Sequence, residues 1–174
     1  MPKVAIVMGS DSDLSIMKES GDLLDKFGVD YEYVISSAHR LPVQTAEYAK
    51  SARDRGVKII IAGAGGAAHL PGVIAAYTIL PVIGVPIKTS TLQGVDSLYS
   101  IVQMPKGIPV ATVSINGAAN AALLAIAMLA LENQTLAGAL DDYRMRMADE
   151  VSAKDQRLKT QGVVAYLKEK GGQA

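Results

Sequence analysis

Residues 60–72 read Ile60-Ile61-Ala62-Gly63-Ala64-Gly65-Gly66-Ala67-Ala68-His69-Leu70-Pro71-Gly72. An apolar, β-branched run passes directly into a loop of glycine and alanine and then reaches a histidine. Side chains this small let a ligand approach backbone N–H groups, and a helix beginning near Ala67 would point its positive end at the same place. The stretch predicts a strand, a ligand-binding loop and a helix, although a tight strand-to-helix connection without a ligand would use the same glycines.

Apolar, β-branched runs recur along the chain with helical patterns between them. The runs cover Lys3–Met8, Tyr31–Ser36, Val57–Ala62, Pro81–Val85 and Val110–Ile115. Strands that alternate with helices form a parallel sheet with helices on both faces. We therefore predict a three-layer α/β/α fold built on a five-stranded parallel sheet and followed by C-terminal helices.

The helical patterns have recognisable ends. The first apolar stripe ends at Gly28, and the second helix is expected from Pro42 to Gly56. Residues 118–131 are apolar except at Asn120, which predicts a buried helix, shorter than the roughly 20 residues of a membrane span. A helix that is apolar all round needs cover all round, so we expect part of it to pack against another subunit.

The length of the chain suits one domain with a complete core. We expect a single domain over residues 1–174, with a core over about 1–132 and a helical tail over about 133–170. In the tail we expect a long amphipathic helix that includes Val151, a further amphipathic piece over Asp155–Lys170, and a frayed end over Gly171–Ala174.

Composition argues against several classes of protein. The 17 basic and 17 acidic side chains balance, and no stretch gathers Lys and Arg into a stripe, so we expect no nucleic-acid partner. The chain has no cysteine, and neither of its two histidines has a partner at ligand spacing, so we expect no metal site. No signal-peptide pattern precedes Val4 and no membrane span is expected, which predicts a cytoplasmic protein.

Ligands of such sheets bind beyond the carboxyl ends of the strands, so the loops there are the expected place of a site. The loop after the first strand reads Gly9-Ser10-Asp11-Ser12-Asp13. Backbone N–H groups and a serine hydroxyl suit a phosphate, whereas Asp13 suits the hydroxyl groups of a sugar. The loop therefore predicts a ribose phosphate, although Ser10 and Asp13 also form a capping box that helix capping alone would explain.

The loop after the second strand reads Ser36-Ser37-Ala38-His39-Arg40-Leu41-Pro42. Alone, His39 and Arg40 would be an ordinary exposed pair. At this edge, however, a guanidinium can grip an oxyanion with two bonds, and His39 is the best acid/base candidate of the chain. We expect His69 in the first turn of the next helix, where the helix dipole disfavours a positive charge, so His69 is expected to donate or orient.

Four motifs together extend over much of the chain. They are Gly9-Ser10-x-Ser12-Asp13, Ser37-Ala38-His39-Arg40, residues 63–72, and Gly94-Val95-Asp96-Ser97-Leu98-Tyr99-Ser100-Ile101-Val102-Gln103-Met104-Pro105. Over roughly Val4 to Leu131 the chain resembles the class I N5-carboxyaminoimidazole ribonucleotide mutases of bacterial purine biosynthesis. The resemblance implies a flavodoxin-like octamer that converts this carbamate to 4-carboxy-5-aminoimidazole ribonucleotide without metal, ATP or another cofactor.

The resemblance also implies roles for individual residues. It makes His39 the general acid/base and His69 its catalytic companion. It assigns the binding of the ribonucleotide to a second group of residues: Ser10, Ser12, Asp13, Ser37 and Arg40. It adds a third group to the residues that bind the substrate: Ala64, Gly65, Gly66, Ala68 and Leu70. It places the region of Gly65 and Gly66, together with His69, at the carboxylate or carbon dioxide pocket. Leu41 departs from the family pattern, which usually has a threonine and thus a helix N-cap there, and the tail beyond Glu132 carries no recognisable motif.

Other classes of protein share parts of this sequence pattern. A sibling class carboxylates aminoimidazole ribonucleotide directly with carbon dioxide, but it lacks the run over residues 65–72, which favours the mutase. A receiver domain needs an aspartate where Gly63 stands, and a flavin module needs more rings than one Phe and no Trp provide. A purely structural oligomer leaves the three loops unexplained. Since the chain has no P-loop, a separate ATP-dependent enzyme is expected to make the carbamate.

Overall fold

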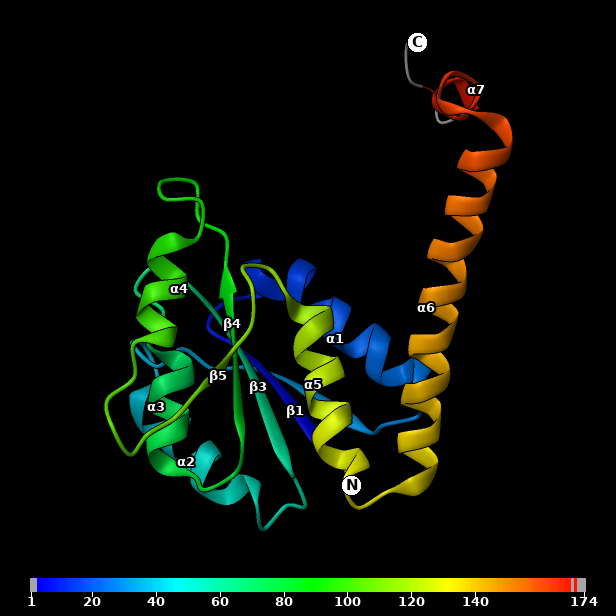
Figure 1. Cartoon of the computed structure of the whole chain (residues 1–174). Helices are drawn as coiled ribbons and strands as arrows, with labels where there is room; N and C mark the ends of the chain where they lie inside the picture. The colour runs from blue at the N-terminus through cyan, green and yellow to red at the C-terminus, as the bar shows by residue number, and fades with distance from the viewer. Residues whose placement is uncertain (1–2, 170, 172–174) are drawn as a thin grey trace. The chain divides into compact units, whose positions relative to one another are not determined.

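The computed structural model describes residues 3–169 and 171. The chain divides into two compact units, Met1–Glu132 and Asn133–Ala174. The first unit holds a sheet with helices on both of its faces, and the second unit holds two helices (Figure 1). Within the described ranges, no helix combines the length and the apolar character that crossing a membrane requires.

The sheet of the first unit is parallel throughout. Its strands are β1 (Val4–Met8), β2 (Tyr31–Ile35), β3 (Ile59–Gly65), β4 (Val82–Ile87) and β5 (Ala111–Thr112). They lie in the order β2-β1-β3-β4-β5, and Val4 pairs with Tyr31 on one side and with Ile59 on the other. Every residue of β1 and β4 is buried, which is why these strands are continuously apolar. The predicted five-stranded parallel sheet is confirmed.

Helices cover both faces of this sheet. On one face lie α1 (Leu14–Lys26), preceded by the short helix η1 (Asp11–Asp13), and α5 (Ala118–Ala130) (Figure 1). On the other lie α2 (Pro42–Ala52), α3 (Leu70–Tyr77) and α4 (Val95–Val102) (Figure 1). Helix α5 is covered on one face only in the single chain. It buries the face that carries Ala118, Ala121, Ala122, Ala125 and Ile126, whereas its other apolar side chains are only half-buried.

Several predicted boundaries needed correction. Strand β3 runs to Gly65, because Ala64 and Gly65 still pair with Pro86 and Ile87 of β4. Strand β5 is an edge strand of two residues, far shorter than Val110–Ile115. Helix α2 ends at Ala52 and continues as turns to Gly56, and α3 begins at Leu70, after a tight turn.

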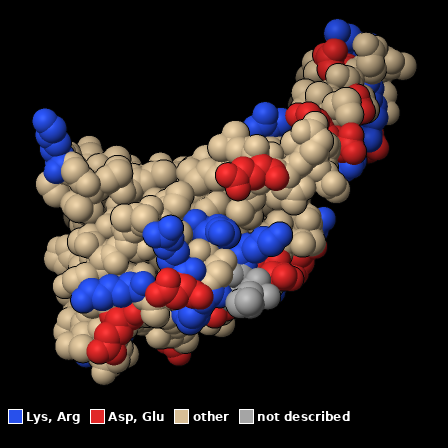
Figure 2. Space-filling model, turned by 90° about the horizontal axis from the view of Figure 1, so that it is seen from below, with Lys and Arg blue, Asp and Glu red and all other residues tan. Residues whose placement is uncertain are grey.

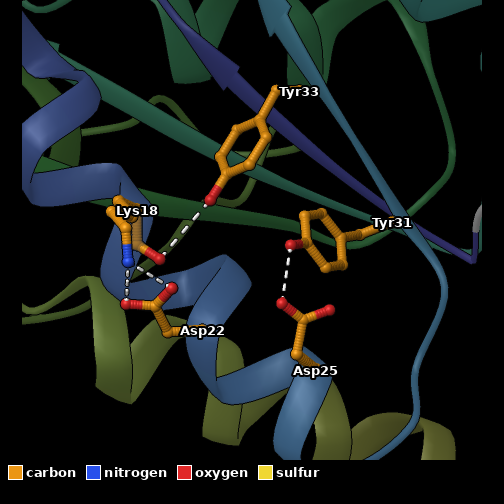
Figure 3. A network of polar contacts seen from close by, with 5 residues as sticks. All are labelled: Lys18, Asp22, Asp25, Tyr31 and Tyr33. Atoms are coloured by element: carbon orange, nitrogen blue, oxygen red, sulfur yellow. Dashed lines mark hydrogen bonds and ion pairs between the residues drawn. The ribbon is translucent and has the colours of Figure 1, made fainter.

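Edge strand β2 is tied to α1 by its tyrosines (Figure 3). The Tyr31 hydroxyl donates to Asp25 Oδ2 at 3.0 Å, and the Tyr33 hydroxyl donates to the Lys18 carbonyl at 3.4 Å. Gly21 makes room for this contact, since a Cβ atom there would lie 2.1 Å from the Tyr33 hydroxyl oxygen. The edge strand is thereby fixed to the helix that follows the first loop.

The described residues of the second unit form α6 (Gln134–Gln161) and α7 (Val163–Glu169). The Asn133 side chain caps α6 by accepting from the Leu136 N–H at 3.1 Å. Gly162, with φ of 75°, separates the two helices, so the break falls there and the expected boundary before Asp155 is wrong. Lys170 and all of the predicted frayed end except Gly171 lie outside the described residues.

Charged side chains of both signs lie among one another on the face at the amino ends of the strands (Figure 2). This matches the formal net charge of zero. The carboxyl ends of the strands lie at the opposite edge of the sheet (Figure 1), and the residues predicted to bind a ligand gather there.

Candidate active site

A cleft of about 530 Å³ opens at the carboxyl ends of β1, β3 and β4. Ten predicted site residues line it: Ser10, Ser12, Asp13, Ser37, His39, Arg40, Ala64, Gly65, His69 and Leu70. Because parallel strands all end at one edge, loops that are distant in the sequence meet there. The structure thus brings together the three loops in which the sequence predicted chemistry.

Gly66 and Ala68 do not line this cleft, in contrast to the expectation. Ala68 is 1% exposed within the hydrophobic core, and its N–H donates to the Gly66 carbonyl at 2.8 Å. Gly66 adopts a left-handed φ of 69°, and its own N–H donates to the Ser97 hydroxyl at 2.9 Å. Their polar backbone groups are engaged in holding the turn, so neither residue presents an N–H group to a ligand.

Six further residues line the cleft: Gly9, Ala38, Ala67, Ile87, Lys88 and Thr89. Three of them, Ile87, Lys88 and Thr89, come from the end of β4 and the loop after it. Lys88 adds a second cationic side chain to the lining, which also contains Arg40. The sequence contained a signal for this loop, since it follows a predicted strand just as the first three loops do.

The two histidines form a pair in the cleft. His39 Nε2 and His69 Nδ1 are 2.6 Å apart, and the two rings meet nearly edge to face, with an interplanar angle of 80°. Hydrogen bonding between two ring nitrogens requires that one donates and the other accepts. The pair can therefore hold one extra proton while the contact lasts, because two N–H groups cannot face each other. His69 lies just before the first residue of α3, at the N-cap, and not within its first turn.

Arg40 joins the first two loops. Its Nη2 donates to the Gly9 carbonyl at 3.0 Å, and its Nε donates to the Ser37 hydroxyl at 3.3 Å. The Ser37 hydroxyl also accepts from the Arg40 N–H at 3.3 Å. The guanidinium is therefore held at the cleft wall, and its remaining N–H groups can donate to a ligand.

The first loop caps a short helix and still faces the cleft. The Ser10 hydroxyl accepts from the Ser12 N–H at 3.3 Å, so Ser10 caps η1. Asp13 does not complete the predicted capping box; it accepts from the Ser12 hydroxyl at 3.2 Å. Burial raises the pKa of Asp13, the Ser12 hydrogen bond opposes that effect, and the neighbouring Asp11 carboxylate adds to it.

The cleft offers hydrogen-bonding and proton-transfer chemistry. Serines and an arginine can bind an anion, a carboxylate can bind sugar hydroxyls, and the imidazole pair can carry a proton. Among residues 3–169 and 171, no three His, Cys, Asp or Glu side chains are grouped so that they could hold a metal ion.

Strand order β2-β1-β3-β4-β5 defines a flavodoxin-like α/β protein, and its polar cleft lies at the carboxyl ends of the strands, where such folds bind small molecules. Residues 3–150 match the family model described as AIR carboxylase, and the chain belongs to that family. The family predicted from the four motifs is thereby confirmed.

Individual relatives cover nearly the whole chain. The N5-carboxyaminoimidazole ribonucleotide mutase of Thermotoga maritima is 57% identical over 98% of this chain and 99% of that protein. The phosphoribosylaminoimidazole carboxylase of Saccharomyces cerevisiae is 54% identical over 97% of this chain, which spans 30% of that longer protein. The crystal structure of Treponema denticola PurE superposes with a TM-score of 0.83 at 30% identity, covering 91% of this chain and 99% of that one.

Proposed function

We propose that this chain is an N5-carboxyaminoimidazole ribonucleotide mutase of purine biosynthesis, an isomerase that moves a carboxyl group from nitrogen to a ring carbon. One observation carries the proposal. The His39 and His69 imidazoles are 2.6 Å apart in a cleft that also presents Ser10, Asp13 and Arg40, in a chain 57% identical to a protein of that name.

The ribonucleotide lies across the first two loops. Its phosphate accepts hydrogen bonds from Arg40 and from the serines Ser10 and Ser37, while the Asp13 carboxylate accepts from the ribose hydroxyls. Because the Asp13 carboxylate contacts the sugar and not the phosphate, the two negative charges stay apart. Lys88, which also lines the cleft, supplies a further positive charge for a substrate that carries both a phosphate and a carboxylate.

The reaction needs two proton transfers and no net change in atoms. A proton reaches the carbamate nitrogen, the nitrogen–carboxyl bond breaks, and carbon dioxide is released into the cleft. The ring carbon then attacks carbon dioxide and loses its own proton. His39 can give the first proton and take the second, which contributes about 10² to 10⁴-fold to the rate. His69 stabilises the charged state by accepting a hydrogen bond from the protonated ring.

Confinement supplies the remaining acceleration. Carbon dioxide that escapes to water is lost, whereas a cleft with small walls keeps it against the ring carbon. Ala64, Gly65 and Ala67 provide such walls, and holding two reactants together is worth up to roughly 7–11 kcal/mol in ideal cases.

The same proposal extends to the partners of the chain. A separate ATP-dependent enzyme makes the carbamate from 5-aminoimidazole ribonucleotide, and both act in the cytoplasm. The chain forms a homo-oligomer, an octamer as the family resemblance implies. The exposed apolar side chains of α4, among them Tyr99 at 59% exposure, support an association of this kind.

The direct experiment offers the purified chain the carbamate substrate with chelator present and ATP left out. The proposal expects the C-carboxylated isomer to form. Replacement His39→Asn should lower turnover at least about a hundredfold while substrate affinity changes little, since one proton carrier is lost and most contacts remain. Near-normal turnover in that variant removes His39 from the mechanism. Turnover of aminoimidazole ribonucleotide with carbon dioxide, and none of the carbamate, would assign the chain to the direct carboxylases.

A further inference from the structure

A buried serine lies directly behind the glycine and alanine turn. Ser97 of α4 is 0% exposed, and its hydroxyl donates to the Ile87 carbonyl at the end of β4 at 2.6 Å. The same oxygen accepts from the Gly66 N–H at 2.9 Å. A hydroxyl has one proton to donate and lone pairs that accept, so Ser97 bridges the end of β4 and the turn after β3.

The turn that Ser97 holds has no regular secondary structure to keep it in place. Gly66 has a φ of 69°, a conformation that glycine adopts at little cost. A second serine of α4 holds the other polar group of this residue, because the Ser100 hydroxyl donates to the Gly66 carbonyl at 3.3 Å. Both backbone groups of Gly66 are thus fixed by hydroxyls from one face of a single helix.

The position of this turn determines what the cleft presents. Gly65 and Ala67, on either side of Gly66, line the cleft, and His69 follows three residues later. The contact of 2.6 Å between His69 Nδ1 and His39 Nε2 depends on where the turn delivers His69. A displacement of about 1 Å in such a group can cost about a hundredfold in rate.

Helix α4 is itself anchored to the cleft. Thr89, which lines the cleft, donates from its hydroxyl to Asp96 Oδ1 at 2.8 Å and accepts from the Gly94 N–H at 3.3 Å. Asp96 is the neighbour of Ser97 in the first turn of α4. The start of the helix is therefore fixed to the loop after β4, which gives Ser97 a defined position from which to hold Gly66.

We propose that Ser97 is a positioning residue for the reaction: its hydroxyl fixes the turn at Gly66 so that His69 meets His39 and the small walls of the cleft stay closed around carbon dioxide. Its effect on turnover rests on the proposed function, whereas its effect on the histidine pair does not. Neither the composition of the chain nor the Gly-Ala run reveals this role, because Ser97 and Gly66 are linked by a contact between distant segments.

The test compares Ser97→Ala with Ser20→Ala. Ser20 is the matched control, since it is also 0% exposed and its hydroxyl donates to a backbone carbonyl, that of Ala118, at 2.7 Å, between α1 and α5. Ser97→Ala loses two hydrogen bonds of a buried hydroxyl and Ser20→Ala loses one, so both variants should melt at lower temperature than the parent. Below that temperature, Ser97→Ala should lower kcat about ten- to a hundredfold with KM changed less than about threefold, and Ser20→Ala should leave both nearly unchanged.

Two additional measurements separate positioning from general destabilisation. The imidazole proton and nitrogen resonances of the histidine pair should shift in Ser97→Ala and stay in place in Ser20→Ala, and Ser97→Thr, which keeps the hydroxyl, should restore them. Ser97→Ala should also release more decarboxylated aminoimidazole ribonucleotide per turnover. If Ser97→Ala matches Ser20→Ala in the resonances and in kcat, the proposal is wrong. If the parent chain does not isomerise the carbamate, the proposed function fails and the resonances alone decide the role of Ser97.

Discussion

Arg40 shows how one side chain can prepare a binding site and also take part in it. Its guanidinium donates to the Gly9 carbonyl at 3.0 Å and to the Ser37 hydroxyl at 3.3 Å, so it is fixed by contacts within the protein itself. A donor fixed in this way loses little conformational entropy when an oxyanion arrives. The first two loops of the cleft are therefore preorganised around a cation.

Replacement Arg40→Ala should weaken binding of the ribonucleotide about ten- to a hundredfold, since a hydrogen bond to a charged group is worth about 1.5–3 kcal/mol. A phosphate-free nucleoside analogue should lose much less. Calorimetric titration with both ligands measures the difference, and Arg40→Lys, which keeps the charge, should recover part of it. Equal losses for the two ligands would show that Arg40 does not bind the phosphate.

Asp13 carries a carboxyl group whose pKa is raised in the folded protein. Burial, opposed by the Ser12 hydroxyl and reinforced by Asp11, leaves its pKa in the folded protein above the ordinary value of 3.8. A carboxyl group whose pKa is raised by folding stabilises the protein fully below its unfolded pKa, and this contribution is lost as the pH rises through the folded pKa. At neutral pH the ionised Asp13 side chain therefore opposes folding.

The neutral variant Asp13→Asn should accordingly be more stable than the parent at pH 7. The gain should shrink as the pH falls toward the ordinary value of 3.8, where the parent side chain is protonated as well. Denaturant unfolding over this pH range measures the trend, and affinity for the ribonucleotide should fall about tenfold. A variant that is less stable than the parent at pH 7 would contradict this interpretation.

At the scale of elements, β4 and α4 lie closer together than ordinary side chains permit. A Cβ atom on Gly84 would lie 2.4 Å from Ile101 Cγ2 and 2.9 Å from Val110 Cγ1. The glycine thus lets α4 approach the sheet, and this approach places Ser97 within reach of the Ile87 carbonyl, 2.6 Å from its hydroxyl. Packing between two elements sets the geometry of a turn in the cleft.

Gly84→Ala should therefore destabilise the protein by about 1–3 kcal/mol through overpacking. Ile101→Ala alone should cost about 2–5 kcal/mol, because it opens a cavity in the core. In the double variant the new methyl group occupies part of that cavity, so the combined loss should be smaller than the sum. Denaturant unfolding of the four proteins gives the coupling, and strictly additive losses would show that the two positions do not meet.

The elements also show why sequence predicted some features and missed others. Strands β1 and β4 were predictable because burial on both faces demands an unbroken apolar run, although β4 runs to Ile87, two residues past its predicted end at Val85. The length of β5 was not predictable, because an edge strand pairs on one side only and its length depends on how far it pairs with β4. The gathering of the candidate site residues at the strand ends was predictable from topology. The absence of Gly66 from the cleft lining was not, because its N–H donates to Ser97, which lies in another element.

At the scale of the whole molecule, α4 leaves an apolar stripe uncovered in the single chain. Val95, Tyr99 and Val102, spaced by four and three residues on one helical face, are 43%, 59% and 48% exposed. Ser97 is a buried residue of the same helix. An association through this stripe would therefore also hold in place the helix that fixes the turn at Gly66. The stripe is a candidate contact surface of the proposed homo-oligomer.

Sedimentation at micromolar concentration should give a mass several times 18.2 kDa, and eight times that value for an octamer. Tyr99→Asp should lower the mass, since burying an unpaired charge in an interface is costly. Tyr99→Phe should keep the assembly, because it retains the apolar ring. A fully active monomer in the parent protein would contradict the proposed assembly.

In the proposed reaction, one cleft moves a carboxyl group from nitrogen to carbon within a single substrate molecule. The most direct measurement uses the carbamate labelled with ¹³C in its carboxyl group, in buffer containing unlabelled bicarbonate, without ATP or metal. If carbon dioxide stays confined beside Ala64, Gly65 and Ala67, most of the product should carry the label. A product whose carboxyl carbon comes mainly from the buffer would contradict the account.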